Sequence, residues 1–399
     1  MKEESFLTAG SSSPEKANTE AAYQTGFVLW RAAENGFASW ALKGLSVTSR
    51  GALELDRAMA RAESDPYPEG AYQGGNYYNG GTFFLGEAIS PEIKTALHYR
   101  EAIASWNALT PGGSWLEVQF RARYGSRWSK WYVLGIWASD DSTIRRHSVK
   151  HQGDADGFVA VDTFVSTNQE ETTDAFQLRL RLFSADGSAI PVVQNISVAY
   201  STAKPASVPV SRGDQSRWNT FLNVLQCSQM VYPNGGNVWC SPTSLAMVLS
   251  YWDGYIGPRE PRVRSFVDGV FDWIFGGHGN WPFNTALAGA LGYEGYVARL
   301  TSLEAVEEFV AAGLPVITSI AWDKGELSGA DVEGSDGHLM VVVGFDSAGN
   351  PIVNDSAAPT DEGVQRTYLR TEFEPLWLRA SGGTVYLIYP PGTGVPDFP

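Results

Sequence analysis

Cysteine is almost absent from this sequence: its 399 residues include two, Cys227 and Cys240. Two cysteines cannot form the multi-disulfide framework of a small secreted scaffold, and they are too few for a thiolate-rich zinc site. The sequence also has neither an HExxH motif nor a glycine-rich phosphate loop with its lysine. We therefore expect no metal and no organic cofactor. The fold must depend on packing, for which hydrophobic residues supply 43% of the chain.

Positive charge is scarce as well. The 29 Lys and Arg residues are outnumbered by 44 Asp and Glu, and no basic stripe is present, so nucleic acid is not an expected partner. No apolar run approaches the roughly 18 residues that span a bilayer, so we expect no membrane insertion. The N-terminus lacks the basic and apolar regions of a signal peptide. Two compartments stay open: secreted, if an export signal was removed or lies upstream, and otherwise cytoplasmic.

The residue pattern divides the chain into four parts. Residues 1–24 are rich in Ser, Glu, Lys and Ala and are predicted to form a flexible tail. Residues 25–203 contain many short alternating segments separated by turns and no helical pattern, which predicts an all-β antiparallel sandwich. Residues 204–216, KPASVPVSRGDQS, interrupt the periodicity and are predicted to be a linker. Residues 217–399 mix helical and strand patterns, which predicts an α+β domain.

Alternation is clearest in SWLEVQFRARY, residues 114–124. There Leu116 and Val118 share one face while Glu117 and Gln119 share the other, as in a half-buried strand. The same pattern predicts strands at AFQLRLRL, WYVLGIW, GFVAVDTFV and ISVAY.

The second half combines helices with strands. SLAMVLSYW carries an apolar stripe typical of an amphipathic helix, and SLEAVEEFVAAG ends at the helix-stopping Gly313. LPVITSIAW is predicted to be a strand, and HLMVVVGF and PIVND are predicted to form a hairpin joined by DSAGN. The stripe consists of Leu245, Val248, Leu249 and Trp252.

Cys240 lies at the predicted start of the first of these helices. Pro242 has no amide hydrogen and presets φ, which suits the first helical turn, so Cys240 and Ser241 should lie at the helix N-terminus. The unpaired N–H groups there stabilise an anion by roughly 0.3 to 2 kcal/mol. This lowers a thiol pKa by about half a unit to one and a half units. A thiol attacks as the thiolate, so a neighbouring imidazolium is still needed.

His338 is the best placed base among the five histidines, because it opens the apolar strand HLMVVVGF. His278, in the glycine-rich segment FGGHGNW, is a weaker candidate, and the other three fall in the predicted sandwich. Asp355 follows His338 by 17 residues across the predicted hairpin and would orient the imidazole. His338 and Asp355 would lie directly opposite each other if the hairpin were centred between Asp346 and Ser347. The turn residues favour a tip one or two positions later, so a bulge or a stagger is required to bring the two side chains together. Asn354 is the substitute partner.

These segments resemble the papain-like cysteine peptidases related to the bacteriocin-processing, double-glycine leader peptidases. The resemblance covers about residues 217–390 and rests on SQMVYPNGGNVWCSPTSLAMVLSYW, GNWPFN, GLPVI, and GHLMVVVGFD followed by PIVNDSA. It implies a papain-like α+β fold with Cys240 as nucleophile, His338 as base and Asp355 as orienter. The family's oxyanion-hole glutamine falls on Gln229, while Gln226, three residues upstream, fits less well.

Two features differ from the leader peptidases proper. Ser241 stands where they usually have glycine after the cysteine, and no transporter segment is present. The resemblance therefore predicts hydrolysis of peptide bonds in a peptide or protein substrate rather than leader processing.

Three alternatives remain open. A cell-wall amidase or a transglutaminase-like acyl transferase would share the Cys, His, Asp order, and a non-catalytic binding protein could keep the peptidase fold.

Cys227 is expected to be an inert buried thiol, with a disulfide to Cys240 as the alternative. The tryptophans of the predicted sandwich are expected in cores, with a sugar-stacking surface for a glycan or cell-surface ligand as the alternative; they are Trp106, Trp115, Trp128, Trp131 and Trp137.

Overall fold

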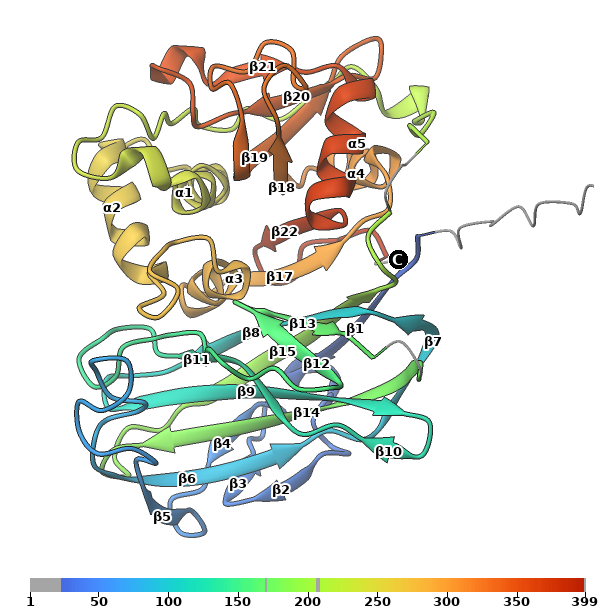
Figure 1. Ribbon diagram of the computed structural model, residues 1–399. Coiled ribbons are helices and arrows are strands. Elements are labelled where there is room, and N and C mark those ends of the chain that lie inside the picture. Colours follow the sequence, from blue (N-terminus) through green and yellow to red (C-terminus); the bar gives the residue numbers. More distant parts are fainter. Residues whose placement is uncertain (1–22, 169–170, 206–208, 398–399) are drawn as a thin grey trace, which may run out of the picture.

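The computed structural model describes residues 23–168, 171–205 and 209–397. Almost all of the predicted tail, residues 1–24, and part of the predicted linker lie outside the described residues. We call strands β1 to β15 the β-domain and the remaining elements the C-terminal domain; Figure 1 shows the two stacked against each other. No helix in the described ranges combines the length and apolar character needed to cross a membrane.

Two antiparallel sheets build the β-domain. The first has the order β12 (Gly157–Ala160), β13 (Thr163–Ser166), β8 (Glu101–Leu109), β15 (Val192–Ser201), β4 (Leu53–Leu55) and β3 (Leu45–Val47), with β1 (Thr25–Arg31) also beside β15. The second has the order β10 (Arg127–Trp128), β9 (Ser114–Tyr124), β14 (Thr173–Ser184), β6 (Thr82–Ile89) and β2 (Ala41–Lys43). It also holds β11 (Tyr132–Trp137) beside β9, β5 (Arg61–Ser64) beside β6 and β7 (Ile93–Tyr99) beside β14.

The predicted all-β, antiparallel character of this region is confirmed. Apolar side chains from both sheets, such as Trp106 on β8 and Phe120 on β9, belong to one buried cluster. Trp115 and Trp137 are also fully buried, so the core role expected for these tryptophans holds at three of the five positions. The other two are half-buried and stack against arginines on the outer face of the second sheet.

Two strand predictions need correction. The strand β9 is not half-buried, because Glu117 is inaccessible to solvent and Gln119 nearly so. The connection between β5 and β6 covers that face, and its Tyr78 hydroxyl donates to Glu117 at 2.6 Å. GFVAVDTFV is not one strand but the hairpin β12–β13, whose turn begins at Val161 with φ of 61°.

The C-terminal domain is built on a third antiparallel sheet with five helices around it. The sheet order is β17 (Glu294–Arg299), β22 (Thr384–Tyr389), β18 (Val316–Trp322), β19 (Ser335–Phe345), β20 (Pro351–Asn354) and β21 (Gln365–Thr367), with β16 (Thr220–Phe221) beside β19. The helices are α1 (Cys240–Asp253), α2 (Arg259–Val270), α3 (Trp281–Ala290), α4 (Leu303–Ala311) and α5 (Arg370–Ser381). Figure 1 shows α1 to α3 on one side of the sheet and α4 and α5 on the other.

Alternate residues of the central strands face these two helical layers. Val341 and Val343 of β19 pack in the cluster that contains α1, while Met340 and Val342 pack in the cluster that contains α4 and α5. Helix α1 is therefore enclosed, and Ser241 to Ser250 are all buried. The prediction that α1 is amphipathic, with one apolar stripe, is therefore wrong, since the helix is buried around most of its circumference.

Helix α3 joins the two domains. Its Phe283 contacts the buried rings of Trp106 and Trp137 from the β-domain, at centroid distances of 6.2 and 5.4 Å. Nearby, Asn107 on β8 donates to the backbone carbonyl of Gly295 at 2.9 Å. Apolar packing thus continues from the β-domain into the C-terminal domain without a solvent layer.

Candidate active site

Cys240 is the first residue of α1, as predicted from Pro242. Its thiol is half-buried and contacts His338 and the backbone N–H of Ser241. Burial raises the thiol pKa, but the hydrogen bond and the charge of His338 outweigh burial, with help from backbone N–H groups. The pKa of Cys240 therefore lies below its ordinary value.

His338 lies on β19 and bonds to Asp355 just beyond β20. Its Nε2 is 2.7 Å from Oδ1 of Asp355, which leaves Nδ1 as the ring nitrogen that faces the thiol. Asn354 pairs with Val341, so Asp355 lies beside Met340 and one diagonal step from His338 on the same face. The expected bulge is present in β19, between Val342 and Gly344.

The electrostatics of the pair favour a charged imidazole. Burial lowers the pKa of His338, but the Asp355 carboxylate and the Cys240 thiolate raise it to about 10. Burial also raises the pKa of Asp355, yet the imidazolium and its hydrogen bonds hold that pKa below the ordinary value. The backbone N–H of Ala357 donates to Oδ1 at 2.9 Å and the hydroxyl of Tyr368 to Oδ2 at 2.7 Å. Because the pKa of Cys240 lies below that of His338, the pair favours thiolate with imidazolium over neutral thiol with neutral imidazole.

Gln229 lies against the same site and is buried. The hydroxyl of Ser356 donates to Oε1 of Gln229 at 2.7 Å, and the backbone N–H of Gln229 donates to the carbonyl of Ser356 at 2.8 Å. Since the side-chain oxygen is used as an acceptor, the amide nitrogen is the end left to donate. Gln229 and Cys240 line one cavity.

That cavity has a volume of about 560 Å³ and three walls. Gln229, Met230 and Val238 form the wall before α1, and the start of β19 with the preceding segment, Gly334 to His338, forms the second. The third is the glycine-rich segment Phe275 to Gly279 between α2 and α3. A cleft of this size suits an extended peptide segment.

The third wall is anchored by Asp272. Its buried carboxylate accepts from the N–H groups of Ile274 and Phe275 at 3.0 and 2.9 Å and from the side chain of Asn280 at 2.9 Å. It also accepts from the N–H of Ser148 in the β-domain at 3.1 Å. The β-domain thus helps to hold one wall of the cavity in place.

The other residues considered from sequence lie apart from the thiol or make no bond to it. Asn354 donates to the carbonyl of Val224 on the opposite face, and Gln226 lines a different cavity. His278 lines the same cavity as Cys240, but burial lowers its pKa to about 4. Cys227 is free and buried, as expected, and forms no disulfide with Cys240.

The sequence analysis did not identify three residues that support the candidate site: Ser356, Tyr368 and Asp272. Ser356 directly follows Asp355 in the sequence, so its position next to a candidate site residue could have pointed to it. Tyr368 and Asp272 carry no signal, because their separation from the site along the chain fits no motif.

In a comparison with known proteins, each half of the chain matches a protein-family model. Residues 27–201 match the model described as Peptidase C39 N-terminal domain, and residues 221–385 match the Peptidase_C39 like family. No curated protein sequence matches the chain.

Two solved structures are distant neighbours. One, from work on carbohydrate-binding modules of the β-sandwich superfamily, shares 9% identity over 45% of this chain and 57% of that chain, with a TM-score of 0.19. The other, assigned as a β-glucanase from Mycobacterium abscessus, shares 11% identity over 40% of this chain and 92% of that chain, with a TM-score of 0.18. Scores this low define no common fold, whereas the two family models agree with each other. The chain belongs to the C39-like, papain-type peptidases that carry an N-terminal accessory domain.

Proposed function

We propose that the C-terminal domain is a papain-like thiol peptidase that hydrolyses peptide bonds through Cys240, His338 and Asp355. The observation that supports this best is the unbroken chain of contacts from the thiol through the imidazole to a buried carboxylate. In this proposal residues 217–399 are the catalytic domain with a papain-like α+β fold. Residues 25–203 are the accessory domain, and residues 204–216 link the two.

The first half-reaction forms an acyl-enzyme. The Cys240 thiolate attacks the scissile carbonyl, a C–S bond forms, and the carbonyl π electrons move to oxygen. When this intermediate collapses, the C–N bond breaks and His338 gives its Nδ1 proton to the leaving amine. Asp355 holds the ring in place through Nε2 throughout.

The second half-reaction releases the acid. Water loses a proton to His338 while its oxygen attacks the acyl carbon, and the C–S bond breaks to restore the thiolate. In both steps the side-chain amide of Gln229 and the backbone N–H of Cys240 stabilise the negative oxygen. Ser356 keeps the amide nitrogen of Gln229 available for this role.

A peptide library read by mass spectrometry tests the proposal. The wild-type protein should cleave a subset of peptides, and Cys240→Ala should cleave none, whereas Cys227→Ala should keep full activity as the matched cysteine control. Intact-mass measurement should also find the acyl group on Cys240 when deacylation is slow. Cleavage that survives in Cys240→Ala would refute the mechanism.

The alternatives make different predictions in the same assay. A cell-wall amidase would cleave peptidoglycan fragments and leave linear peptides intact, and an acyl transferase would join an added amine to the substrate rather than release an acid. A non-catalytic binding protein would retain peptides without cleaving any of them.

A further inference from the structure

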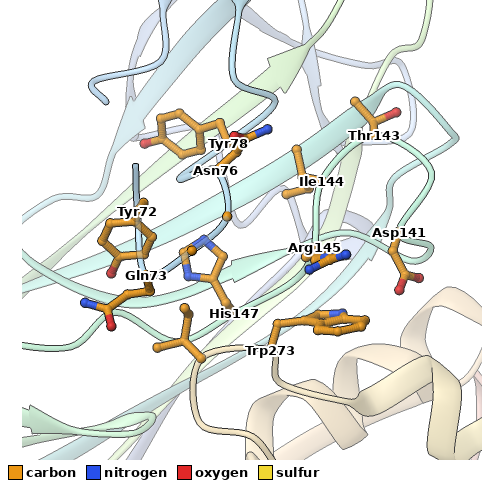
Figure 2. A pocket seen from close by; sticks show the side chains of 13 residues that line it. Tyr72, Gln73, Asn76, Tyr78, Asp141, Thr143, Ile144, Arg145, His147 and Trp273 are labelled. Carbon is orange, nitrogen blue, oxygen red and sulfur yellow. The ribbon is translucent and has the colours of Figure 1, made fainter. Parts of the chain in front are cut away.

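A second cavity lies at the junction of the two domains. It has a volume of about 340 Å³ and is bounded by the Tyr72–Tyr78 segment between β5 and β6 and by the Asp141–His147 segment after β11. The C-terminal domain adds Trp273, from the connection between α2 and α3. Figure 2 shows Tyr72 and Gln73 at the left, Arg145 at the right, His147 between them and Trp273 below.

Two local features mark this cavity. The hydroxyl of Tyr72 is buried and has no acceptor for its hydrogen among the described residues, although the backbone N–H of Lys150 approaches it. The next residue, Gln73, is held at φ of 50°, in the left-handed region that non-glycine residues rarely adopt. The positive φ of Gln73 serves the two-residue turn that the Tyr72–Gly75 backbone bonds close, whereas the unpaired hydroxyl of Tyr72 has no such role in the fold.

The cavity also presents aromatic surface. The indole of Trp273 is 40% exposed, and the Arg145 guanidinium lies 4.3 Å from its centroid. The ring of Tyr72 lies 5.5 Å from that of His147. Aromatic rings and polar groups therefore line one small cleft together.

The aromatic surface continues beyond the cavity. A neighbouring cavity of about 520 Å³ shares Tyr72 and Tyr78 with it and adds Tyr67, Tyr77 and Trp131. Tyr67 is 45% exposed, and its ring lies 5.2 Å from Tyr72. Aromatic side chains thus line two neighbouring cavities.

The chemistry of this lining matches a neutral saccharide. Sugar rings expose C–H faces that pack on aromatic rings, and each hydroxyl both donates and accepts, which suits a wall of mixed amide, hydroxyl, carboxylate and guanidinium groups. Charges of both signs, from Asp141 and Arg145, give no preference for an anion. Extended peptides usually pair with an open strand edge, whereas the backbone groups of Tyr72 and Gly75 already bond to each other. We propose that this cavity is the binding site for a neutral oligosaccharide.

The proposal concerns the junction of the two domains and does not depend on the chemistry of Cys240. Isothermal titration of the full chain with neutral hexasaccharides of glucose, N-acetylglucosamine, mannose and xylose tests it, with an uncharged peptide of similar length in parallel. At least one saccharide should bind and change the tryptophan fluorescence of the protein.

Three variants locate the binding. Tyr72→Phe removes only a hydroxyl that has no acceptor in the free protein, so it should leave the melting temperature unchanged and weaken binding about 3- to 10-fold. Trp273→Ala should weaken binding at least about tenfold, as truncated aromatic anchors do. Phe158→Ala, at a ring that is 39% exposed elsewhere on the β-domain, should change nothing.

Three results would overturn the proposal. They are a failure of every saccharide to bind at millimolar concentration, binding that is unaltered in both Tyr72→Phe and Trp273→Ala, and binding of the peptide alone. Gln73→Ala provides a further check, because Gln73 is exposed and its loss removes a polar contact without disturbing the core.

Discussion

His338 and Asp355 meet through a 2.7 Å hydrogen bond although the strand register does not place them opposite each other. Asp355 reaches the ring diagonally, from the first position after β20, where Ala357 and Tyr368 also bond to its carboxylate. The carboxylate is thus fixed by three donors, and the imidazole is fixed by the carboxylate.

Asp355→Asn tests this relationship through the pH profile of kcat/KM. The carboxylate helps to raise the pKa of His338 to about 10, so loss of its charge should lower that pKa toward the ordinary value of about 6.5. We expect the alkaline limb of the profile to move down by at least about one pH unit and kcat/KM at neutral pH to fall at least about tenfold. An unchanged alkaline limb would show that Asp355 does not govern the imidazole.

The same substitution should make stability depend differently on pH. The raised folded pKa of His338 means that its contribution is complete below about pH 6.5 and is lost as pH rises through about 10. The lowered pKa of Asp355 means that its contribution is present above about pH 4 and is lost as pH falls through the folded value. Urea unfolding should therefore show the largest loss of stability in Asp355→Asn between about pH 4 and 6.5. A loss that grows toward pH 10 would contradict this assignment.

The two thiols should differ sharply in reactivity. The pKa of Cys240 is below its ordinary value, while burial raises the pKa of Cys227 to about 12. Iodoacetamide at about pH 6 to 7 should modify Cys240 alone, because the thiolate is the nucleophile. Peptide mapping should find the rate at least about tenfold lower in His338→Ala. Modification of Cys227 first, or equal rates in the variant, would disprove the thiolate–imidazolium pair.

Gln229→Ala should lower kcat by about 10²- to 10³-fold with little change in KM, the loss typical of one oxyanion donor. Gln226→Ala is the matched control, since Gln226 lies three residues away in another cavity and should have no effect. Ser356→Ala should give a smaller loss of kcat, because the Gln229 amide stays in place but is no longer oriented by the Ser356 hydroxyl. Steady-state kinetics distinguishes the three variants, and equal effects of Gln229→Ala and Gln226→Ala would exclude the proposed role.

Local chemistry made the core of this site predictable. Pro242 fixes where α1 begins, so the position of Cys240 followed from one residue. The hairpin of β19 and β20 followed from apolar runs around a polar turn, although its offset could not be derived because a bulge depends on packing. Burial was less predictable: Glu117 looks like a surface residue until a distant connection covers it, and α1 is enclosed by elements that its own sequence does not specify. The role of Asp272 was hidden for the same reason, since its partners come from two domains.

A substitution of Asp272 tests whether the β-domain helps to shape the cavity beside Cys240. Asp272→Ala leaves the N–H groups of Ser148, Ile274 and Phe275 and the side chain of Asn280 without their acceptor. Each buried donor left unpaired costs about 1 to 3 kcal/mol before relaxation or water entry. We expect a loss of stability of about 2 to 4 kcal/mol in total, because water can reach part of this segment.

The catalytic consequence should appear mainly in KM. The released segment, Phe275 to Gly279, forms a wall of the cavity but supplies no group to the reaction in the proposed mechanism, so substrate binding should weaken more than kcat falls. Asp268→Ala is the control, because Asp268 lies nearby in the last turn of α2 and its backbone carbonyl, not its carboxylate, accepts the hydrogen bond from Arg146 of the β-domain. An Asp272→Ala protein with normal KM and normal melting temperature would show that the wall holds without the Asp272 carboxylate and its bond to Ser148. A fall in kcat alone would instead place Asp272 in the support of Cys240 and His338.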